Sequence, residues 1–492
     1  MCLPAQPIEA KPKPVQDLTC SDLNVTGNSN CENCAVSELT CFKAYDIRGE
    51  LGVNLDAGIA YRVGRAAAQH LGAGSVVLGR DARESSPELA AAVARGVTEA
   101  GCDVLDIGLA GTEEMYWAVT EFGAAAGIEV TASHNPVNYN GMKIVKAGSR
   151  PLDDAGDFQV IKGLAETRDW AEVNSVGRVT DISGAARAKY VEKVLSFVDA
   201  AKLRPMKVVV NSGNGAAGPT FDAIAGELER RAAPLEFVRV HHDPDHTFPN
   251  GIPNPLLPEN HAATRDAVRA AGADFGVAFD GDFDRCFLFD GRGDFIPGEY
   301  VVGLLASKFL RDEAGARVVH DPRVIWNTRD VVESLGGAAV QSKTGHAFVK
   351  RSMREAGAIY GGEMSAHHYF RDFAFCDSGM IPWLVACEIV SQSGASLGEL
   401  IRERREKFPS SGEINFRVGD ADAAIARVRE QFAGGARVDE ADGLSMSFGD
   451  WRLNVRKSNT EPLVRLNVEA QGRGVNLSSK IDKIAEVMVD TI

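Results

Sequence analysis

The sequence predicts an α/β protein in which three related α/β domains surround a central cleft and a smaller C-terminal α+β domain follows. The first observation is a repeat. Three times, a helix-patterned stretch rich in Ala, Gly and Arg runs into a short apolar strand that ends in a polar loop. The second is size, because 492 residues with 45% hydrophobic content exceed what one core usually holds. The third is a change to short alternating strands after residue 408.

Each repeat begins with an apolar strand that stops in a polar turn and is followed by helix-patterned sequence. These first strands are SVVLGRD (75–81), KVVVNSGN (207–214) and RVVHDPR (317–323). Second strands occupy corresponding places in DVLDIGLAGTEEM, LEFVRVHHDPD and AAVQSKTGHAF. A recurrence at roughly a hundred residues or more is too long for a solenoid and indicates triplicated domains.

The chain divides into five expected segments. They are a disordered N-terminal extension (1–40), three α/β domains (41–185, 186–294 and 295–408) and a C-terminal domain (409–492) that closes with a helix from Ser478 to Ile492. The extension is rich in Pro, Ser and Asn and has no periodicity. Its Cys31-x-x-Cys34 pair has no second pair and no nearby His to complete a zinc site, so we expect reduced, non-liganding cysteines.

Composition excludes some classes of function. A net charge of -15 and a pI near 5.3 argue against a nucleic-acid partner, because binding to phosphate backbones needs a basic surface. No apolar run approaches the ~20 residues needed to span a bilayer, and the N-terminus has no hydrophobic signal core. We therefore expect a cytoplasmic protein without a membrane partner. An anionic small molecule remains compatible with a locally basic cleft.

The third strand of each repeat ends in a loop that carries reactive side chains. Ligands of open α/β sheets sit beyond the carboxyl ends of strands, so the three loops are expected to form one site. The first loop is TASHNP (131–136), in which Ser133 can serve as a nucleophile. Ser, Asn and Pro are also ordinary turn residues. The absence of GxSxG argues against acyl transfer.

The second loop, DGDFDR (280–285), predicts a metal site. Asp280, Asp282 and Asp284 alternate in a turn, which lets three carboxylates converge on one hard cation. Arg285 stands where an EF-hand requires Gly, so that motif is excluded. Three carboxylates without a fourth protein ligand suit Mg²⁺, which completes its shell with water and a phosphate oxygen.

Two further loops offer binding groups. In GEMSAHH (362–368), Glu363 and Ser365 can exchange hydrogen bonds with vicinal sugar hydroxyls, and the histidines lack further metal ligands. In the last domain, RKSNTEPLVR (456–465) has the residue composition of a phosphate-binding loop. Its candidate residues are Arg456, Ser458, Asn459, Thr460 and Arg465. A polar hairpin turn is the alternative interpretation of this loop.

A rival interpretation comes from Gly213, Gly215 and Gly218, which match GxGxxG between an apolar strand and helix-patterned sequence. Glu236 lies about 20 residues further on, where a dinucleotide-binding motif places its ribose-binding acid. This loop, however, ends the first strand of its repeat. An NAD-dependent enzyme would leave the serine, acidic and phosphate loops without a role.

The motifs together resemble the alpha-D-phosphohexomutase family, most closely bacterial members that act on mannose phosphates. They are AYDIRG (44–49), TASHNP, DGDFDR, GEMSAHHYF and RKSNTEP, in this order over residues 41–492. The resemblance implies a phosphoserine at Ser133, Mg²⁺ held by that phosphoserine and the three aspartates, and a fourth domain similar to the TATA-box-binding fold. Phe283 and Ala366 stand where many members have Gly.

The resemblance also implies an activity, the interconversion of mannose 1-phosphate and mannose 6-phosphate through a 1,6-bisphosphate. Alternatives are mutases of glucose or glucosamine phosphates, a sugar-phosphate phosphatase, and a noncatalytic binder. Glucose or mannose 1,6-bisphosphate is the expected activator. The expected catalytic residues are Ser133, Arg48, Lys143, His134, Arg285 and His346, with the acid/base role open between Lys143, His346, His134 and His367. The expected substrate-binding residues are Tyr45, Lys343, Glu363, Ser365, His367, Arg456, Ser458, Asn459, Thr460 and Arg465.

Overall fold

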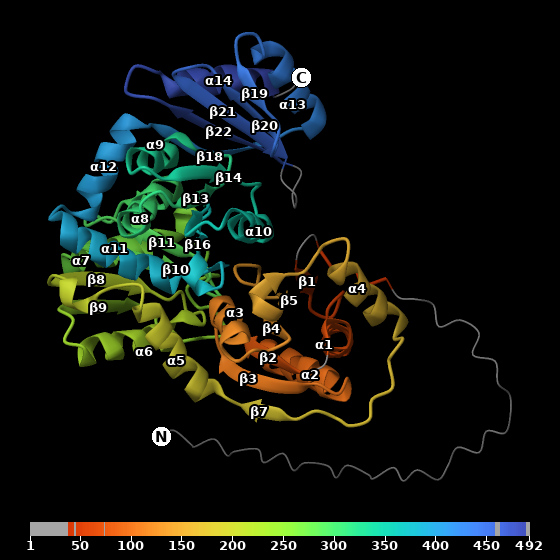
Figure 1. The fold of residues 1–492 in the computed structure, drawn as a ribbon. Helices are drawn as coiled ribbons and strands as arrows, with labels where there is room; N and C mark the ends of the chain where they lie inside the picture. The colour runs from red at the N-terminus through yellow and green to blue at the C-terminus, as the bar shows by residue number, and fades with distance from the viewer. Residues whose placement is uncertain (1–37, 44–45, 73, 458–462, 489–492) are drawn as a thin grey trace, which may run out of the picture. The chain divides into compact units, whose positions relative to one another are not determined.

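The computed structural model describes residues 38–43, 46–72, 74–457 and 463–488, and Figure 1 follows them through four successive sheets. The predicted architecture of three α/β domains and a smaller C-terminal α+β domain is confirmed. Tyr45, Ser458, Asn459 and Thr460 lie outside the described residues, as does most of the expected extension. Leu39 is buried and its amide donates to Glu166 at 2.8 Å, so the folded part begins before residue 41.

The first sheet runs in the order β1-β5-β4-β2-β3-β7, with β6 paired to β5. Its strands are β1 (Ile47–Glu50), β2 (Ser75–Arg80), β3 (Asp103–Leu109), β4 (Ala126–Val130), β5 (Tyr139–Lys146), β6 (Arg150–Pro151) and β7 (Val179–Asp181). Strands β4, β2, β3 and β7 are parallel to one another, whereas β5 is antiparallel to both β4 and β1.

Helices cover both faces of this sheet, and alternate residues of β2 accordingly belong to two different hydrophobic cores. One core contains α1 (Ala57–Leu71), α2 (Ser86–Glu99) and α4 (Asp157–Thr167). The other contains α3 (Thr112–Glu121) and α5 (Ser183–Leu195). Helix α1 starts at Asp56, whose carboxylate accepts from the amide of Ile59 at 2.7 Å.

The second and third sheets each have five strands and share one plan. The second has the order β12-β11-β10-β8-β9 and the third β14-β13-β15-β16-β17. The second domain contains β8 (Met206–Asn211), α6 (Ala217–Arg230), β9 (Leu235–Val240), α7 (Ala262–Ala271), β10 (Phe275–Phe279), β11 (Cys286–Phe289) and β12 (Phe295–Ile296). The third contains α8 (Gly298–Asp312), β13 (Arg317–His320), α9 (Trp326–Ser334), β14 (Ala338–Gln341), α10 (His346–Ala356), β15 (Tyr360–Gly362), β16 (His368–Phe370), β17 (Cys376–Asp377), α11 (Met380–Ser393) and α12 (Leu397–Lys407).

The three reactive loops occupy equivalent places in these sheets. In each sheet a strand that is parallel to its central neighbour turns back into an antiparallel partner, as β4 does into β5, β10 into β11 and β15 into β16. Each turn contains a residue with positive φ that is not glycine: Ser133 (48°), Phe283 (43°) and Ala366 (71°). Residues other than glycine rarely adopt this left-handed backbone conformation, and backbone strain of this kind is common at functional sites.

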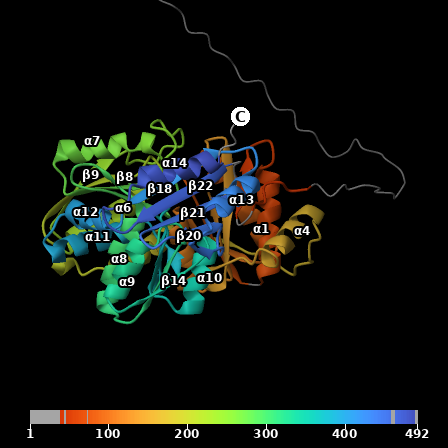
Figure 2. The same cartoon turned by 90° about the horizontal axis from the view of Figure 1, so that it is seen from above.

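The C-terminal domain is an antiparallel sheet in the order β18-β22-β21-β20-β19. Its strands are β18 (Ser410–Arg417), β19 (Arg437–Asp439), β20 (Leu444–Ser447), β21 (Trp451–Lys457) and β22 (Leu463–Ala470). Helices α13 (Ala421–Phe432) and α14 (Leu477–Met488) pack together over one face (Figure 2) and enclose a separate core. No helix in the described ranges has the length and apolar character of a membrane span.

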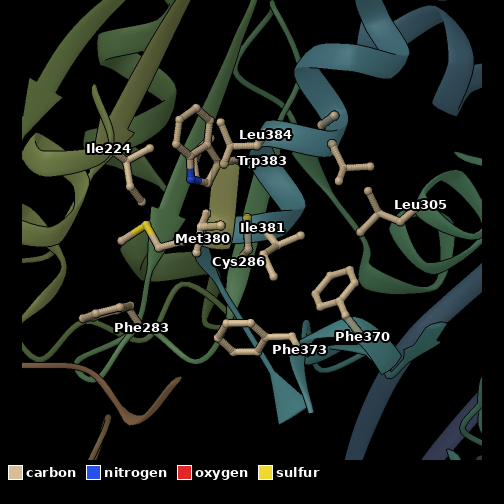
Figure 3. Close-up of a cluster of buried hydrophobic side chains, with 14 of the residues drawn as sticks. Ile224, Phe283, Cys286, Leu305, Phe370, Phe373, Met380, Ile381, Trp383 and Leu384 are labelled. Carbon is tan, nitrogen blue, oxygen red and sulfur yellow. The ribbon is translucent and has the colours of Figure 1, made fainter. Parts of the chain in front are cut away.

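Helix α11 is almost entirely apolar and is buried at each residue from Met380 to Val390, with Glu388 as the one charged residue of that stretch. Figure 3 shows its side chains between those of the second and third domains. The Trp383 ring packs against Phe221 and Phe237, with ring centroids 5.6 and 5.8 Å away. This helix therefore joins the cores of two domains that each supply a reactive loop.

Truncating this aromatic anchor should destabilise both domains together. We expect Trp383→Ala to lower the free energy of unfolding by about 3–5 kcal/mol, because the surrounding side chains cannot refill so large a space. Urea denaturation followed by far-UV circular dichroism measures the change. Val176→Ala, at an exposed position, is the control and should stay within about 0.5 kcal/mol of the parent. A loss for Trp383→Ala as small as the control's would contradict this account of the core.

Candidate functional site

Ser133 is held in its loop by a buried arginine. Its amide donates to the Thr131 hydroxyl at 2.8 Å, and its side chain is almost fully buried. Arg83 donates to four backbone carbonyls of the same loop, those of Ser133, Asn135, Pro136 and Tyr139, at 2.6–3.1 Å. Four contacts from one planar guanidinium fix the loop's backbone and therefore the position of the hydroxyl.

The serine loop and the acidic loop touch directly, although they belong to different domains. The Ser133 hydroxyl donates to Asp280 Oδ2 at 2.9 Å, and Arg285 Nε donates to the same oxygen at 2.8 Å. A Cβ on Gly281 would lie 2.4 Å from the Ser133 carbonyl oxygen, so only glycine permits this approach of the two backbones. The predicted nucleophile and the predicted metal loop therefore form one site.

Asp280, Asp282 and Asp284 converge as predicted, with oxygens within 4.8 Å of one another. All three are buried, and burial raises the pKa of Asp280 to about 6 although Arg285 opposes the shift. Oδ1 of Asp282 and Oδ1 of Asp284 are buried without a hydrogen-bond donor among the described residues. Buried carboxylate oxygens with unused acceptor capacity fit a hard divalent cation such as Mg²⁺.

Lys143 and Thr112 supply donors to this cluster from the first domain. Lys143 Nζ lies 2.8 Å from Asp282 Oδ2 and also donates to Asp284, and the Thr112 hydroxyl donates to Asp282 at 2.6 Å. Burial disfavours the charged ammonium, but the two carboxylates outweigh it and raise the pKa of Lys143. The lysine is therefore a buried cation next to the acidic triad.

The third loop connects to the triad through His367. Its Nε2 lies 3.5 Å from Asp284 Oδ1 and its Nδ1 lies 3.5 Å from Glu363 Oε2. Burial opposes the imidazolium, yet the neighbouring carboxylates raise the pKa of His367 to about 9. Glu363 also accepts from the Gly345 amide at 2.8 Å and from the Tyr369 hydroxyl at 2.5 Å. The position of the glutamate is thus set by two hydrogen-bond donors and by the ion pair with His367.

Arg323 extends the site to the fourth domain. Its Nη2 lies 3.5 Å from the Ser365 hydroxyl, and its Nη1 lies 3.6 Å from Glu413 Oε2 on β18. Arg456 Nη2 lies 3.0 Å from the same oxygen, and Arg465 Nη1 lies 3.2 Å from Glu413 Oε1. The predicted phosphate-binding arginines therefore sit together, with Arg323 as a third member.

The remaining candidates lie around Ser133 or further away. Arg48 donates to the Thr131 carbonyl at 2.5 Å and pairs with Asp46, whose carboxylate lies 3.9 Å from His346 Nε2. Arg285 also donates to His134 Nδ1, and burial lowers the pKa of His134 well below its usual value. Lys343 is exposed, with its Nζ 6.0 Å from the Phe348 ring centroid, and joins none of the contacts described for these candidates.

The sequence prediction missed Arg83, Arg323 and Glu413. The two arginines occupy the same place, because each follows the first strand of its repeat in an Asp-x-Arg turn. The Arg83 amide donates to Asp81 at 3.0 Å and the Arg323 amide to Asp321 at 2.9 Å. The repeated DAR and DPR after two apolar strands were therefore a usable signal. Nothing in the sequence around Glu413 indicates its partners.

The glycines of the GxGxxG match serve close packing. A Cβ on Gly215 would lie 2.7 Å from the carbonyl oxygen of Gly281 in the acidic loop, and one on Gly218 would lie 2.1 Å from the His242 carbonyl oxygen. Glu236 lies on β9, where it pairs with Lys207 at 3.0 Å. The glycine-rich turn therefore packs directly against the backbone of the acidic loop.

Models of known families match the chain in all four domains. Phosphoglucomutase/phosphomannomutase alpha/beta/alpha domains I, II and III match residues 40–170, 188–293 and 297–408, and the C-terminal domain of the same family matches 413–486. The chain belongs to the phosphoglucomutase/phosphomannomutase family. It is therefore an enzyme of the phosphohexomutase class of isomerases, as its motifs predicted.

Individual relatives agree with the family assignment. A phosphomannomutase of Salmonella montevideo is 55% identical over 454 residues, which are 92% of this chain and 100% of that protein. A phosphomannomutase of Escherichia coli (strain K12) is 54% identical over 440 residues, 89% of this chain and 96% of the relative. A crystal structure of a phosphoglucomutase/phosphomannomutase family protein from Burkholderia thailandensis is 32% identical with a TM-score of 0.80, covering 91% of this chain and 95% of that chain.

The acidic triad should govern the dependence on Mg²⁺. We expect Asp282→Asn to raise the Mg²⁺ concentration needed for half-maximal mutase activity about tenfold to a hundredfold, because an amide is a poorer ligand for a hard cation. Mg²⁺ titration of initial rates measures this. Asp266→Asn, at an exposed aspartate paired with Arg265, is the matched control and should titrate like the parent. Identical Mg²⁺ titrations for Asp282→Asn and Asp266→Asn would show that the triad does not bind the metal.

Proposed function

We propose that this enzyme interconverts mannose 1-phosphate and mannose 6-phosphate through a phosphoserine at Ser133 and a 1,6-bisphosphate intermediate. The observation that carries the proposal is the hydrogen bond of 2.9 Å between the Ser133 hydroxyl and Asp280, which puts a potential phosphoryl carrier at a cluster able to hold a cation. The phosphomannomutases that are 54–55% identical support mannose as the sugar.

Two phosphoryl transfers account for the reaction. The 6-hydroxyl of mannose 1-phosphate attacks the phosphorus on Ser133, the bond from phosphorus to Oγ breaks, and the hydroxyl proton passes to a base. The resulting 1,6-bisphosphate reverses its orientation. Ser133 Oγ then attacks the phosphorus of the 1-phosphate, the bond from that phosphorus to the C1 oxygen breaks, and the C1 oxygen takes up the proton held by the base, which leaves mannose 6-phosphate and restores the phosphoserine. Every step can run backwards, so the same site serves both directions.

The residues around Ser133 supply charge and alignment, which are the main demands of phosphoryl transfer. Arg285 and Lys143 are buried cations beside the serine and the triad, and we assign them to stabilise charge on the transferred group. Mg²⁺ held by Asp280, Asp282 and Asp284 would supply Lewis-acid neutralisation of the phosphoryl oxygens. Arg48 orients the strand end before Ser133 through the Thr131 carbonyl. The acid/base role stays open between Lys143, His134, His346 and His367.

The other end of the substrate is assigned to the third and fourth domains. Glu363 and Ser365 would bind sugar hydroxyls, and Arg323, Arg456 and Arg465 would hold the phosphate that is not transferred. Tyr45, Ser458, Asn459 and Thr460 belong to the same proposal from sequence alone. Reversal of the intermediate requires both phosphates to fit the same phosphate-binding site. A hexose 1,6-bisphosphate is therefore proposed as the activator. Glucose phosphates are proposed as additional substrates.

The test supplies purified protein with mannose 1-phosphate, Mg²⁺ and a trace of glucose 1,6-bisphosphate. Formation of mannose 6-phosphate, detected by a coupled assay, is the expected result. Release of inorganic phosphate would identify a phosphatase, and no change in either would leave a binding protein. Repeating the assay with glucose and glucosamine phosphates ranks the sugars.

Removing the proposed phosphoryl carrier should abolish turnover without abolishing binding. We expect Ser133→Ala to lower kcat by more than about a thousandfold, because the alanine cannot form the covalent intermediate. Calorimetric titration with mannose 1-phosphate should still detect binding, since the arginines are unchanged. Ser85→Ala, a serine at the start of α2, is the control. Activity of Ser133→Ala near the control's level would refute the phosphoserine mechanism.

The phosphate and hydroxyl contacts should be separable by mutation. Arg456→Ala should raise KM for mannose 1-phosphate and glucose 1-phosphate by similar factors of about tenfold to a hundredfold, because a charge-assisted hydrogen bond contributes roughly 1.5–3 kcal/mol. Glu363→Gln should instead change the ratio of kcat/KM between the two sugars, whose hydroxyl stereochemistry differs. Steady-state kinetics with both substrates measures this. If Arg456→Ala changed the sugar preference and Glu363→Gln did not, the phosphate and hydroxyl assignments of the two residues would have to be exchanged.

A further inference from the structure

Glu413 is the common partner of three arginines from two domains. Arg323 follows β13 of the third domain, whereas Arg456 and Arg465 lie on β21 and β22 of the fourth. Their guanidinium nitrogens lie 3.0–3.6 Å from the two oxygens of this carboxylate. The Glu413 side chain retains 19% of its exposure, so a ligand in solution can reach the group. One carboxylate thus stands where three cations meet.

A β-bulge directs this side chain. Ser410 pairs with Glu469, but the next paired residue on β18 is Glu413, opposite Asn467, so the register shifts between them. Gly412 within the bulge has φ of 65°, which favours glycine. Side chains fix the irregularity, because the Ser411 hydroxyl accepts from the Val468 amide at 2.9 Å and Asn467 Nδ2 donates to the Gly412 carbonyl at 3.0 Å. Bulges of this kind re-aim side chains beside functional sites.

The carboxylate satisfies only part of the cluster. Three guanidinium groups present many N–H donors, whereas Glu413 offers two oxygens. Arg323 has two further carboxylate partners, Asp321 at 2.7 Å and Glu363 at 3.9 Å. Nε of Arg323 and Nε of Arg456 are buried without an acceptor in the part of the chain that the structure describes. Burial, and then the charge of Arg323, lower the pKa of Arg456. The cluster therefore retains unused N–H donors that the oxygens of a phosphate dianion would match.

We propose that Glu413 is an internal competitor of the phosphate that is not transferred, and that it limits how tightly the arginines hold that phosphate. The choice of hexose phosphate as the ligand rests on the function proposed above. A phosphate entering the cluster has to share the guanidinium donors with a carboxylate of like charge, which weakens its binding. Binding that is equally strong before and during the transfer lowers KM without raising kcat.

The reaction gives this competition a purpose. The bisphosphate must leave the arginines with one phosphate and return to them with the other, so contacts in the cluster have to break in every cycle. A carboxylate already aimed at the same donors takes them over as the phosphate leaves, and no buried guanidinium is left without a counterion. Glu413 is therefore assigned as a positioning residue that favours reversal of the intermediate over its retention.

The direct test is binding of inorganic phosphate and of mannose 1-phosphate, measured by isothermal titration calorimetry on the full chain. Glu413→Gln keeps the size of the side chain and removes its charge, and Glu413→Ser removes most of it as a second variant. Both should bind each ligand about tenfold more tightly than the parent. Glu440→Gln is the matched control, since Glu440 lies in the same domain and pairs with Arg429 at 2.6 Å. Unchanged or weaker binding in both Glu413 variants would overturn the proposal.

Kinetics tests the second half of the inference. We expect Glu413→Gln to lower KM and kcat together, as reversal of the intermediate slows, whereas loss of a merely structural contact would raise KM. An unaltered kcat would refute the role in reversal. The two proposals fail separately. If the parent protein converts no hexose phosphate but Glu413→Gln still tightens phosphate binding, the mutase assignment is wrong and the competitor stands. If the parent is a mannose phosphate mutase and Glu413→Gln does not tighten phosphate binding, the mutase assignment stands and the competitor role of Glu413 is wrong.

Discussion

The site depends on the contact in which Asp280 accepts hydrogen bonds from both Ser133 and Arg285. The serine comes from the first sheet and the two charged residues from the second, so Ser133 and the acidic triad form one site only if the domains dock in a fixed register. Phe283 helps to set that register. A Cβ on Gly111 of the first domain would overlap its ring, and one on Gly379 would lie 2.3 Å from its carbonyl oxygen. The left-handed backbone at Phe283 is thus held by packing from two sides.

From Asp280 a continuous series of charged contacts runs through the second, third and fourth domains. It passes from Arg285 to Asp284 at 3.8 Å, through His367 and Glu363 to Arg323, and from there through Glu413 to Arg456. Most of these groups are buried, where an unpaired charge costs several kcal/mol and a paired one far less. The charges therefore constrain one another. Substitutions along this series are expected to be strongly non-additive, because each changes the partner of its neighbour.

Much of this organisation could be predicted from the sequence, because local patterns determine it. Repeated apolar strands with polar ends located the three sheets, and the acidic alternation of DGDFDR located the triad. Arg83 and Arg323 were missed since their partners are backbone carbonyls and carboxylates far along the chain, although the repeated Asp-x-Arg marks them. Glu413 could not be found at all, because its orientation follows from a bulge in a strand pairing that brings together residues more than fifty positions apart. Tertiary register, rather than propensity, decides such cases.

The two ends of the site solve the same electrostatic problem with opposite charges. At one end three carboxylates face the ammonium of Lys143, and at the other three guanidinium groups face the carboxylate of Glu413. Buried clusters of one sign would be unfavourable in the ligand-free protein, so each cluster has an internal partner of the opposite sign. Arg285 and His367 add positive charge beside the triad, and Asp321 adds negative charge beside Arg323. What stays unused among the described residues is hydrogen-bonding capacity, namely buried carboxylate oxygens of Asp282 and Asp284 at one end and the Nε donors of Arg323 and Arg456 at the other. The proposed cation and the proposed phosphate would each match the unused groups of its own end.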